Sequence, residues 1–124
     1  MITIDIPKAL WLTSNSRPHR AVKWQTVAAV RALGKQAATA SGERYTVASC
    51  LVAVGYPMSD KLRADPPNAY DPVTKAAIDG CVDAGLLPDD SSEHLPVVSF
   101  TRGPKSAPGT YRLTLTFTDQ EVPF

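Results

Sequence analysis

Cysteine and long apolar segments are scarce in this sequence, and their scarcity argues against two classes of protein. Cys50 and Cys81 belong to no Cys-x-x-Cys pair and no Cys/His cluster, so a structural zinc site is not expected. We interpret both as buried free thiols. No apolar run approaches the ~20 residues that a membrane-spanning helix requires. The N-terminal MITIDIPK lacks the basic start and apolar stretch of a signal peptide, so we expect a cytoplasmic protein.

The chain also lacks internal repeats, low-complexity tracts and any linker long enough to divide it. Its 124 residues, of which 44% are hydrophobic and 20% charged, are typical of a soluble globular domain that buries its own core. We therefore expect a single domain over residues 1–124.

Charge is nearly balanced overall but unevenly distributed along the chain. The net charge is +1, yet residues 8–44 contain seven basic residues and one acid, whereas residues 60–93 contain eight acids and three basic residues. A metal-dependent nuclease needs such a combination, because one region holds phosphates and the other holds the cation. The alternative is chance clustering of charges on a solvated surface.

Hydrophobic periodicity predicts an α+β fold, a mixed β-sheet with two helices in the order β-α-β-α-β-β. Strands are predicted over residues 2–6, 45–55, 95–101 and 110–118. The apolar centre of the second strand indicates burial on both faces.

The two predicted helices carry different signals. The first, over residues 19–40, has an apolar side and a basic side. The second has Asp71 as its N-cap, Pro72 as its first residue and Gly85 as its stop. Residues 71, 75, 79 and 83 (Asp, Lys, Asp, Asp) recur every four residues and share one side of that helix. On its own, such a ladder is typical of a solvated helix face.

Further oxygen ligands flank the second helix. Asp65 and Asn68 precede it, and Asp89 and Asp90 follow its stop. Hydrolysis of a phosphodiester with Mg²⁺ or Mn²⁺ requires oxygen ligands that converge from separate segments. A nearby lysine such as Lys75 stabilises the charge that develops on the phosphate. The segment therefore favours a metal-dependent phosphodiesterase.

One segment combines several short motifs, and it covers residues 63–90, RADPPNAYDPVTKAAIDGCVDAGLLPDD. In chain order these are a leading arginine, an Asp-x-x-Asn element, a Lys-Ala-x-x-Asp helix start, an Ala-Gly turn and a closing Asp-Asp. In this pattern the chain resembles the RusA family of Holliday-junction endodeoxyribonucleases, particularly its phage and prophage branch. A second match is the N-terminal strand followed by LTSNSR (residues 12–17) and a basic helix.

The resemblance implies a homodimer that binds a four-way DNA junction and makes paired nicks with Mg²⁺ or Mn²⁺. For a phage-encoded protein the location would be the host cytoplasm. Asp65 and Asp90 correspond to metal-binding catalytic carboxylates and Lys75 to the essential lysine. Asp89 is a further candidate ligand.

The third carboxylate of the family pattern is missing, because Pro67 stands two residues after Asp65. Asp71, four residues before Lys75, is either its catalytic, metal-binding replacement or only an N-cap. Asn68 is an amide ligand, a residue that orients Asp65, or a turn residue. For Asp79 we favour a supporting role.

The predicted DNA-binding surface is mainly basic, and its first members gather at the start of the first helix, where N–H groups also favour phosphate. The predicted contacts are Asn15, Arg17, His19, Arg20, Lys23, Arg31, Lys35, Arg63, Arg102 and Lys105. Trp24 either stacks on a base at the branch point or packs in the core, and we favour the core.

Three functions are compatible with these patterns. The first is a metal-dependent endonuclease that resolves four-way junctions and similar branched DNA. The second is a RusA-like module that binds branched DNA without cleaving it. The third is a structural or protein-interaction domain whose acidic stripe is a solvated helix face.

Overall fold

The computed structural model describes residues 1–58 and 65–120 and contains the six predicted elements in the predicted order. They are β1 (Ile2–Pro7), α1 (Arg20–Ser41), β2 (Ala48–Gly55), α2 (Lys75–Asp83), β3 (Val98–Arg102) and β4 (Thr110–Asp119). The α+β prediction is thus confirmed. Short 3-10 turns lie at Lys8–Leu10 and Pro66–Ala69, and a wider π-helical turn covers Tyr70–Thr74.

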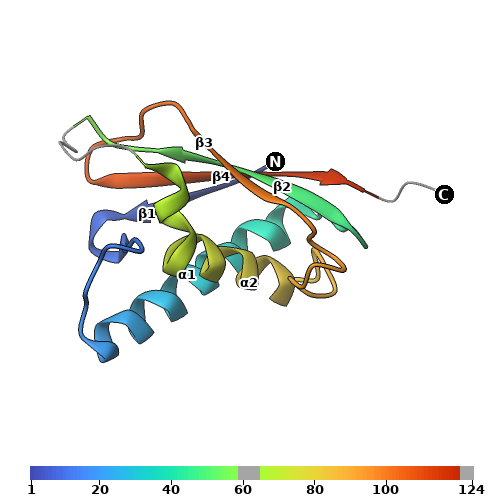
Figure 1. The fold of residues 1–124 in the computed structure, drawn as a ribbon, viewed down its shortest axis with the longest axis horizontal. Coiled ribbons are helices and arrows are strands. Elements are labelled where there is room, and N and C mark those ends of the chain that lie inside the picture. Colours follow the sequence, from blue (N-terminus) through green and yellow to red (C-terminus); the bar gives the residue numbers. More distant parts are fainter. Residues whose placement is uncertain (59–64, 121–124) are drawn as a thin grey trace.

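The four strands form one mixed sheet in the order β1-β4-β2-β3. β4 is antiparallel to both of its neighbours, whereas β2 and β3 are parallel and are connected through α2, as a parallel pair requires a crossover. Both helices lie on the same side of the sheet (Figure 1). β3 is an outer strand, which leaves its inward-facing side chains at the margin of the helical layer.

The core lies between this sheet and the two helices. Strand residues alternate between a buried and an exposed face, as in β1, where Ile2, Ile4 and Ile6 are buried and the residues between them are exposed. The prediction that β2 is buried on both faces is wrong, because Leu51 is 43% exposed. The physical reason is that the helices cover only one face of the sheet.

Two glycines bring α1 and α2 into close contact. A Cβ atom added at Gly34 would collide with the backbone oxygen of Ala77, and one added at Gly80 would collide with that of Arg31. The helices therefore approach backbone to backbone at both points, with the Sγ of Cys81 3.8 Å from the Gly34 oxygen. Gly34 and Gly80 have a packing role inside helices that glycine otherwise destabilises.

The ends of α1 match the prediction to within one residue. The Nδ1 atom of His19 accepts a hydrogen bond from the Ala21 N–H and caps the start of the helix. Gly42 ends the helix with φ +69°, in the left-handed region.

The start of the second helix differs from the prediction. The regular helix begins at Lys75, and the turn before it is interrupted at Asp71, which has φ −111° and ψ 123°. A residue before proline avoids helical angles, so Pro72 separates Asp71 from the helix. No hydrogen bond joins the Asp71 carboxylate to a backbone N–H among the described residues, and its predicted role as a side-chain N-cap is therefore wrong. Gly85 has φ +88° just beyond α2, in agreement with the predicted stop.

Candidate functional site

Lys75 lies between two carboxylates at the beginning of α2. Its Nζ atom is 3.5 Å from Oδ2 of Asp79, one helical turn along, and 3.3 Å from Oδ2 of Asp90, in the loop after the helix. The backbone N–H of Asp90 is in turn held by the carboxylate of Asp89 at 2.8 Å. We call Lys75, Asp79 and Asp90 the Lys75 cluster.

The charges of the Lys75 cluster shift one another's protonation. Burial opposes the charged form of Lys75, but Asp79 and Asp90 outweigh it and raise the pKa of the lysine. Burial and a hydrogen bond shared with Asp90 raise the pKa of Asp79. The same hydrogen bond, together with Lys75, lowers the pKa of Asp90 against the effect of burial. Of the two carboxylates, Asp79 therefore holds a proton more readily.

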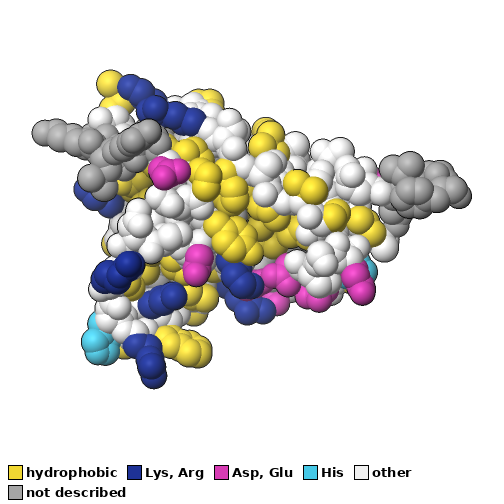
Figure 2. Space-filling model, viewed as in Figure 1, with side chains coloured by type: hydrophobic (Ala, Val, Ile, Leu, Met, Phe, Trp, Pro, Cys, Tyr) yellow, Lys and Arg dark blue, Asp and Glu magenta, His cyan; other side chains and the backbone are white. Residues whose placement is uncertain are grey.

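A hollow of about 340 Å³ opens beside this cluster. Two of its lining residues, Lys75 and Asp90, belong to the cluster, and the others are apolar or aromatic: Tyr70, Ile78, Leu95, Pro96, Val98 and Phe100. We call it the Lys75 hollow. Apolar side chains gather over the centre of this face of the molecule, with basic and acidic side chains at their border (Figure 2).

Asp71 lies at a different hollow, of about 160 Å³, although it follows Tyr70 directly in the chain. The hollow, which we call the Lys23 hollow, is lined by Leu12, Thr13, Ser14, Ser16, Arg17, Pro18, Lys23, Asp71 and Pro72. As one of its two predicted roles, Asp71 would share a metal with Asp90; in the structure it lines this hollow together with Arg17 and Lys23, two cations of the N-terminal region.

Ser14, in the loop before α1, forms hydrogen bonds to Asn68, in the segment before α2. The backbone N–H of Ser14 donates to the backbone carbonyl oxygen of Asn68 at 3.0 Å, and the Ser14 hydroxyl donates to the same oxygen at 3.1 Å. The side-chain amide of Asn68 donates to Oδ2 of Asp65 at 3.0 Å. This contact corresponds to one of the roles considered for Asn68, that of a residue orienting Asp65.

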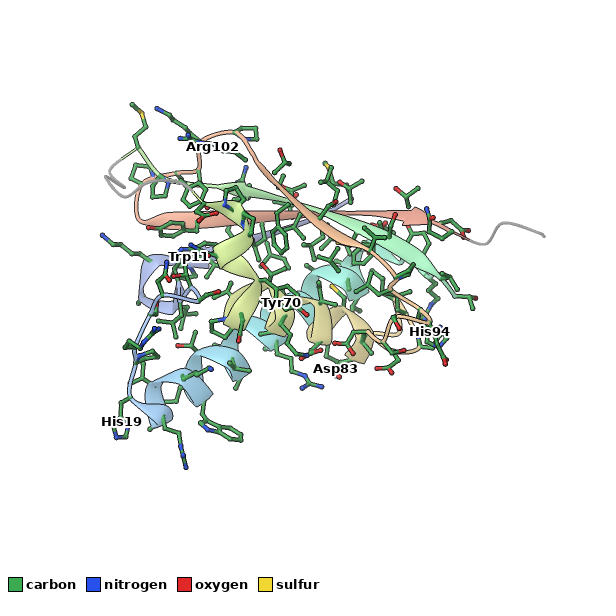
Figure 3. All side chains as sticks on the ribbon, viewed as in Figure 1. Trp11, His19, Tyr70, Asp83, His94 and Arg102 are labelled. Atoms are coloured by element: carbon green, nitrogen blue, oxygen red, sulfur yellow. The ribbon has the colours of Figure 1, made fainter. Side chains whose placement is uncertain are left out.

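The predicted DNA contacts are distributed over several parts of the structure. Arg17, His19, Arg20 and Lys23 are exposed around the start of α1. His19 and Arg102 lie on opposite sides of the molecule (Figure 3). Asn15, Lys35, Arg102 and Lys105 are also exposed. Arg63 lies outside the described residues.

Arg31 differs from the other predicted contacts because it is already paired. Its guanidinium donates to both carboxylate oxygens of Asp83, at 2.6 and 2.8 Å, and so joins α1 to α2. The hydrogen bond and the charge of Asp83 raise the pKa of Arg31 and lower that of Asp83. A phosphate at Arg31 would have to compete with this carboxylate.

Trp24 does not pack in the core, and that prediction is wrong. Its side chain is 71% exposed on the basic side of α1, one helical turn from Arg20. The buried positions of this helix are Thr26, Val30, Gly34 and Ala38, whose four-residue spacing faces the protein interior. The other tryptophan, Trp11, stacks on Tyr111 with ring centres 4.3 Å apart.

Asp79, for which a supporting role is predicted, contacts Lys75 directly, as their spacing of four residues in one helix indicates. One residue of the site was missed in the sequence. Tyr70 carried no signal of its own, because only the folded chain places it beside Phe100 of β3, with ring centres 6.1 Å apart.

The cysteines have the predicted environment. Both are buried free thiols, and burial raises the pKa of each to about 12. In the part of the chain that the structure describes, no helix is long and apolar enough to cross a membrane.

Two comparisons with known proteins found nothing similar: no family model matches this chain, and no curated protein matches its sequence.

The carboxylates of the Lys75 cluster are suited to a divalent cation, although they are few. Within residues 1–58 and 65–120, no three or more His, Cys, Asp or Glu side chains are grouped closely enough to hold a metal together. Mg²⁺ is, however, often bound by one or two carboxylates, with waters and substrate phosphates completing its shell. The ammonium of Lys75 between Asp79 and Asp90 indicates that this position attracts positive charge.

Proposed function

We propose that this chain is a divalent-metal-dependent, structure-specific endodeoxyribonuclease that hydrolyses phosphodiesters in four-way junctions and similar branched DNA. The observation that carries the proposal is the Lys75 cluster, in which a lysine and two carboxylates from separate segments converge beside an open hollow. The resemblance of residues 63–90 to the RusA family supports the same activity. The exposed cations around the start of α1 supply a surface for the phosphate backbone.

The proposed division of roles follows the geometry of the cluster. Asp79 and Asp90 would hold Mg²⁺ or Mn²⁺, which would polarise a phosphoryl oxygen and help to activate water. Lys75 donates to a non-bridging oxygen of the phosphate and offsets its developing charge. Asp89 fixes the backbone of Asp90. Asp65 and Asp71 as further metal ligands, which the resemblance implies, stay predictions.

The decisive experiment is cleavage of a synthetic four-way junction in Mg²⁺ or Mn²⁺. The wild-type protein should nick the junction, and Asp90→Asn should abolish nicking while leaving junction binding largely intact. Glu93→Gln is the matched control, because it removes the same charge from an exposed residue three positions away. Nicking by Asp90→Asn at the wild-type rate would rule out this site.

A homodimer is part of the proposal, since a four-way junction has two-fold symmetry and a symmetric pair of subunits matches it. Sedimentation of the full chain, alone and bound to the junction, should give the mass of two 13.3 kDa chains. A monomer in both states would contradict the dimer while leaving the nuclease open.

The second candidate function is a module that binds branched DNA without cleaving it. It is favoured by the absence of a group of three acidic, His or Cys ligands among the described residues and by Pro67 at the position of the family's third acid. Junction-specific binding with no nicking in any divalent metal would support this candidate.

A further inference from the structure

The Lys75 hollow exists because β3 is an outer strand. Val98 and Phe100 pair with Cys50 and Val52 of β2, so they belong to the helix-facing side of the sheet. Cys50 and Val52 are fully buried, whereas Val98 and Phe100 are only half-buried, because the helical layer does not cover the outer strand completely. The fold therefore leaves an apolar recess directly beside Lys75 and Asp90.

Tyr70 forms an aromatic wall of this recess. Its ring stands edge-on to that of Phe100, at 88°, and its side chain remains 40% exposed. The neighbouring Ile78 and Leu95 are buried and continue the apolar lining. Figure 3 shows Tyr70 near the middle of this face, beside the start of α2. A flat apolar group that enters the recess thus has a ring available for stacking.

The recess joins an apolar lining to charged groups suited to phosphate chemistry. Its volume of about 340 Å³ lies at the low end of the range of about 300–1,000 Å³ for sites that take small organic ligands. A nucleotide has both required parts, a flat base and an adjoining phosphate. A base stacked inside a duplex cannot present its face to Tyr70, whereas a base at a branch point is cheaper to unstack.

We infer that the Lys75 hollow takes an unstacked base of the nucleotide next to the phosphate at Lys75, with Tyr70 as the stacking residue. This inference rests on the proposed function and deepens it. It gives a physical reason for selectivity towards branched DNA, because the intact duplex would have to lose the stacking of that base before the phosphate reached Lys75.

The test is a double cycle that combines Tyr70→Ala with an abasic nucleotide at the branch point. Dissociation constants are measured without divalent metal, so that no strand is cut, and the abasic position is moved one nucleotide at a time through the branch point. At one position, the wild-type protein should lose affinity by about 10-fold, since stacking of one base contributes about 1–3 kcal/mol. Tyr70→Ala should lose a similar factor on the intact junction. The two changes together should cost no more than either one alone.

Matched controls separate stacking from folding. Tyr70→Phe should bind the intact junction as the wild type does, and an abasic nucleotide deep in one arm should have no effect. The inference would be overturned if, at every branch-point position, the loss of affinity caused by Tyr70→Ala and the loss caused by the abasic nucleotide multiplied when the two changes were combined. It would also be overturned if Tyr70→Ala changed the sedimenting mass, because the hollow would then be covered by a second copy of the chain. If the wild-type protein bound junction and duplex with equal affinity, the proposed function itself would be contradicted, whatever the effect of Tyr70→Ala.

Discussion

The two hollows, one lined by Tyr70 and the other by Asp71, differ in the ligand groups that they can bind. The Lys75 hollow has an apolar and aromatic lining with one cation and an acid at its rim. The Lys23 hollow is smaller and more polar, and it places Arg17 and Lys23 around the hydroxyl groups of a loop. The first is suited to a reaction at one phosphate with its base, and the second to holding a phosphate electrostatically.

This difference separates residues that the sequence places together. Asp71 and Asp90 were predicted to share one metal, yet they line different hollows because the chain turns at Asp71 before the helix begins. The division predicts that substitution of Lys75 or Asp90 changes the rate of cleavage, whereas substitutions in the Lys23 hollow change only the affinity for DNA.

Beyond the loss of nicking expected for Asp90→Asn, the largest expected effect is that of Lys75→Ala on the cleavage rate. The single-turnover cleavage rate of a four-way junction should fall by about 100- to 1,000-fold, as when one donor to a developing negative charge is removed, with little change in the dissociation constant. Lys23→Ala should show the reverse, a weaker affinity at an unchanged rate and a slope of log K against log salt reduced by about 0.9. Lys8→Ala, an exposed lysine outside both hollows, is the control. If Lys75→Ala and Lys23→Ala lowered the cleavage rate equally, the two hollows would act as one catalytic site, and the division would be wrong.

The next effect concerns the helix contact that supports both hollows, since Lys23 comes from α1 and Lys75 from α2. Gly80→Ala should lower the free energy of unfolding by about 1–3 kcal/mol, because the new Cβ meets backbone atoms of Arg31 and Lys35 that cannot rotate away. Urea denaturation measures this loss. Gly103→Ala is the control, because its new Cβ would come no closer than 3.3 Å to any atom, the Ala53 Cβ, and 3.6 Å to the backbone carbons of Ala53 and Val54. A more stable Gly80→Ala variant would mean that helix propensity outweighs the contact.

How much the sequence predicts depends on whether a feature is local. Periodicity predicted the elements and the ends of α1, and the i,i+4 spacing already paired Lys75 with Asp79. The recess beside β3 was not predictable, because it depends on which strand becomes the outer one. The position of Asp71 was missed because its backbone leaves helical angles before Pro72, so that it does not belong to the helix that begins at Lys75. Trp24 was misassigned because an aromatic residue was assumed to be buried.

A smaller effect tests the position of Asp71. Asp71→Asn removes a negative charge beside Arg17 and Lys23, so the affinity for the junction should rise by about two- to fivefold, the equivalent of ~0.5–1 kcal/mol for an exposed charge pair. The cleavage rate should change by less than about 10-fold. Titration of the junction with protein at constant salt measures the affinity, and single-turnover cleavage measures the rate. A loss of cleavage as complete as that of Asp90→Asn would place Asp71 at the metal and contradict the division of the hollows.

The smallest expected effect is the pH dependence of stability at Asp79. Burial and the hydrogen bond with Asp90 raise its pKa above the ordinary 3.8, so the folded chain disfavours the ionised form. Wild-type stability at this position is therefore complete below pH 3.8 and falls as the pH rises through the raised pKa. Asp79→Asn does not titrate, and at neutral pH it should be more stable than the wild type by less than about 1 kcal/mol, after allowance for solvent screening.

Asp83 supplies the matched control with the opposite sign. Its pKa is lowered by the hydrogen bond from Arg31, so its contribution to stability is present above pH 3.8 and is lost as the pH falls through the lowered value. Asp83→Asn should accordingly be less stable than the wild type at neutral pH, with a deficit that shrinks on acidification. Thermal unfolding of the three proteins between pH 3 and 7 measures both trends. If Asp79→Asn followed Asp83→Asn, then Asp79 would be an ordinary partner of Lys75 rather than the proton-holding member of the Lys75 cluster.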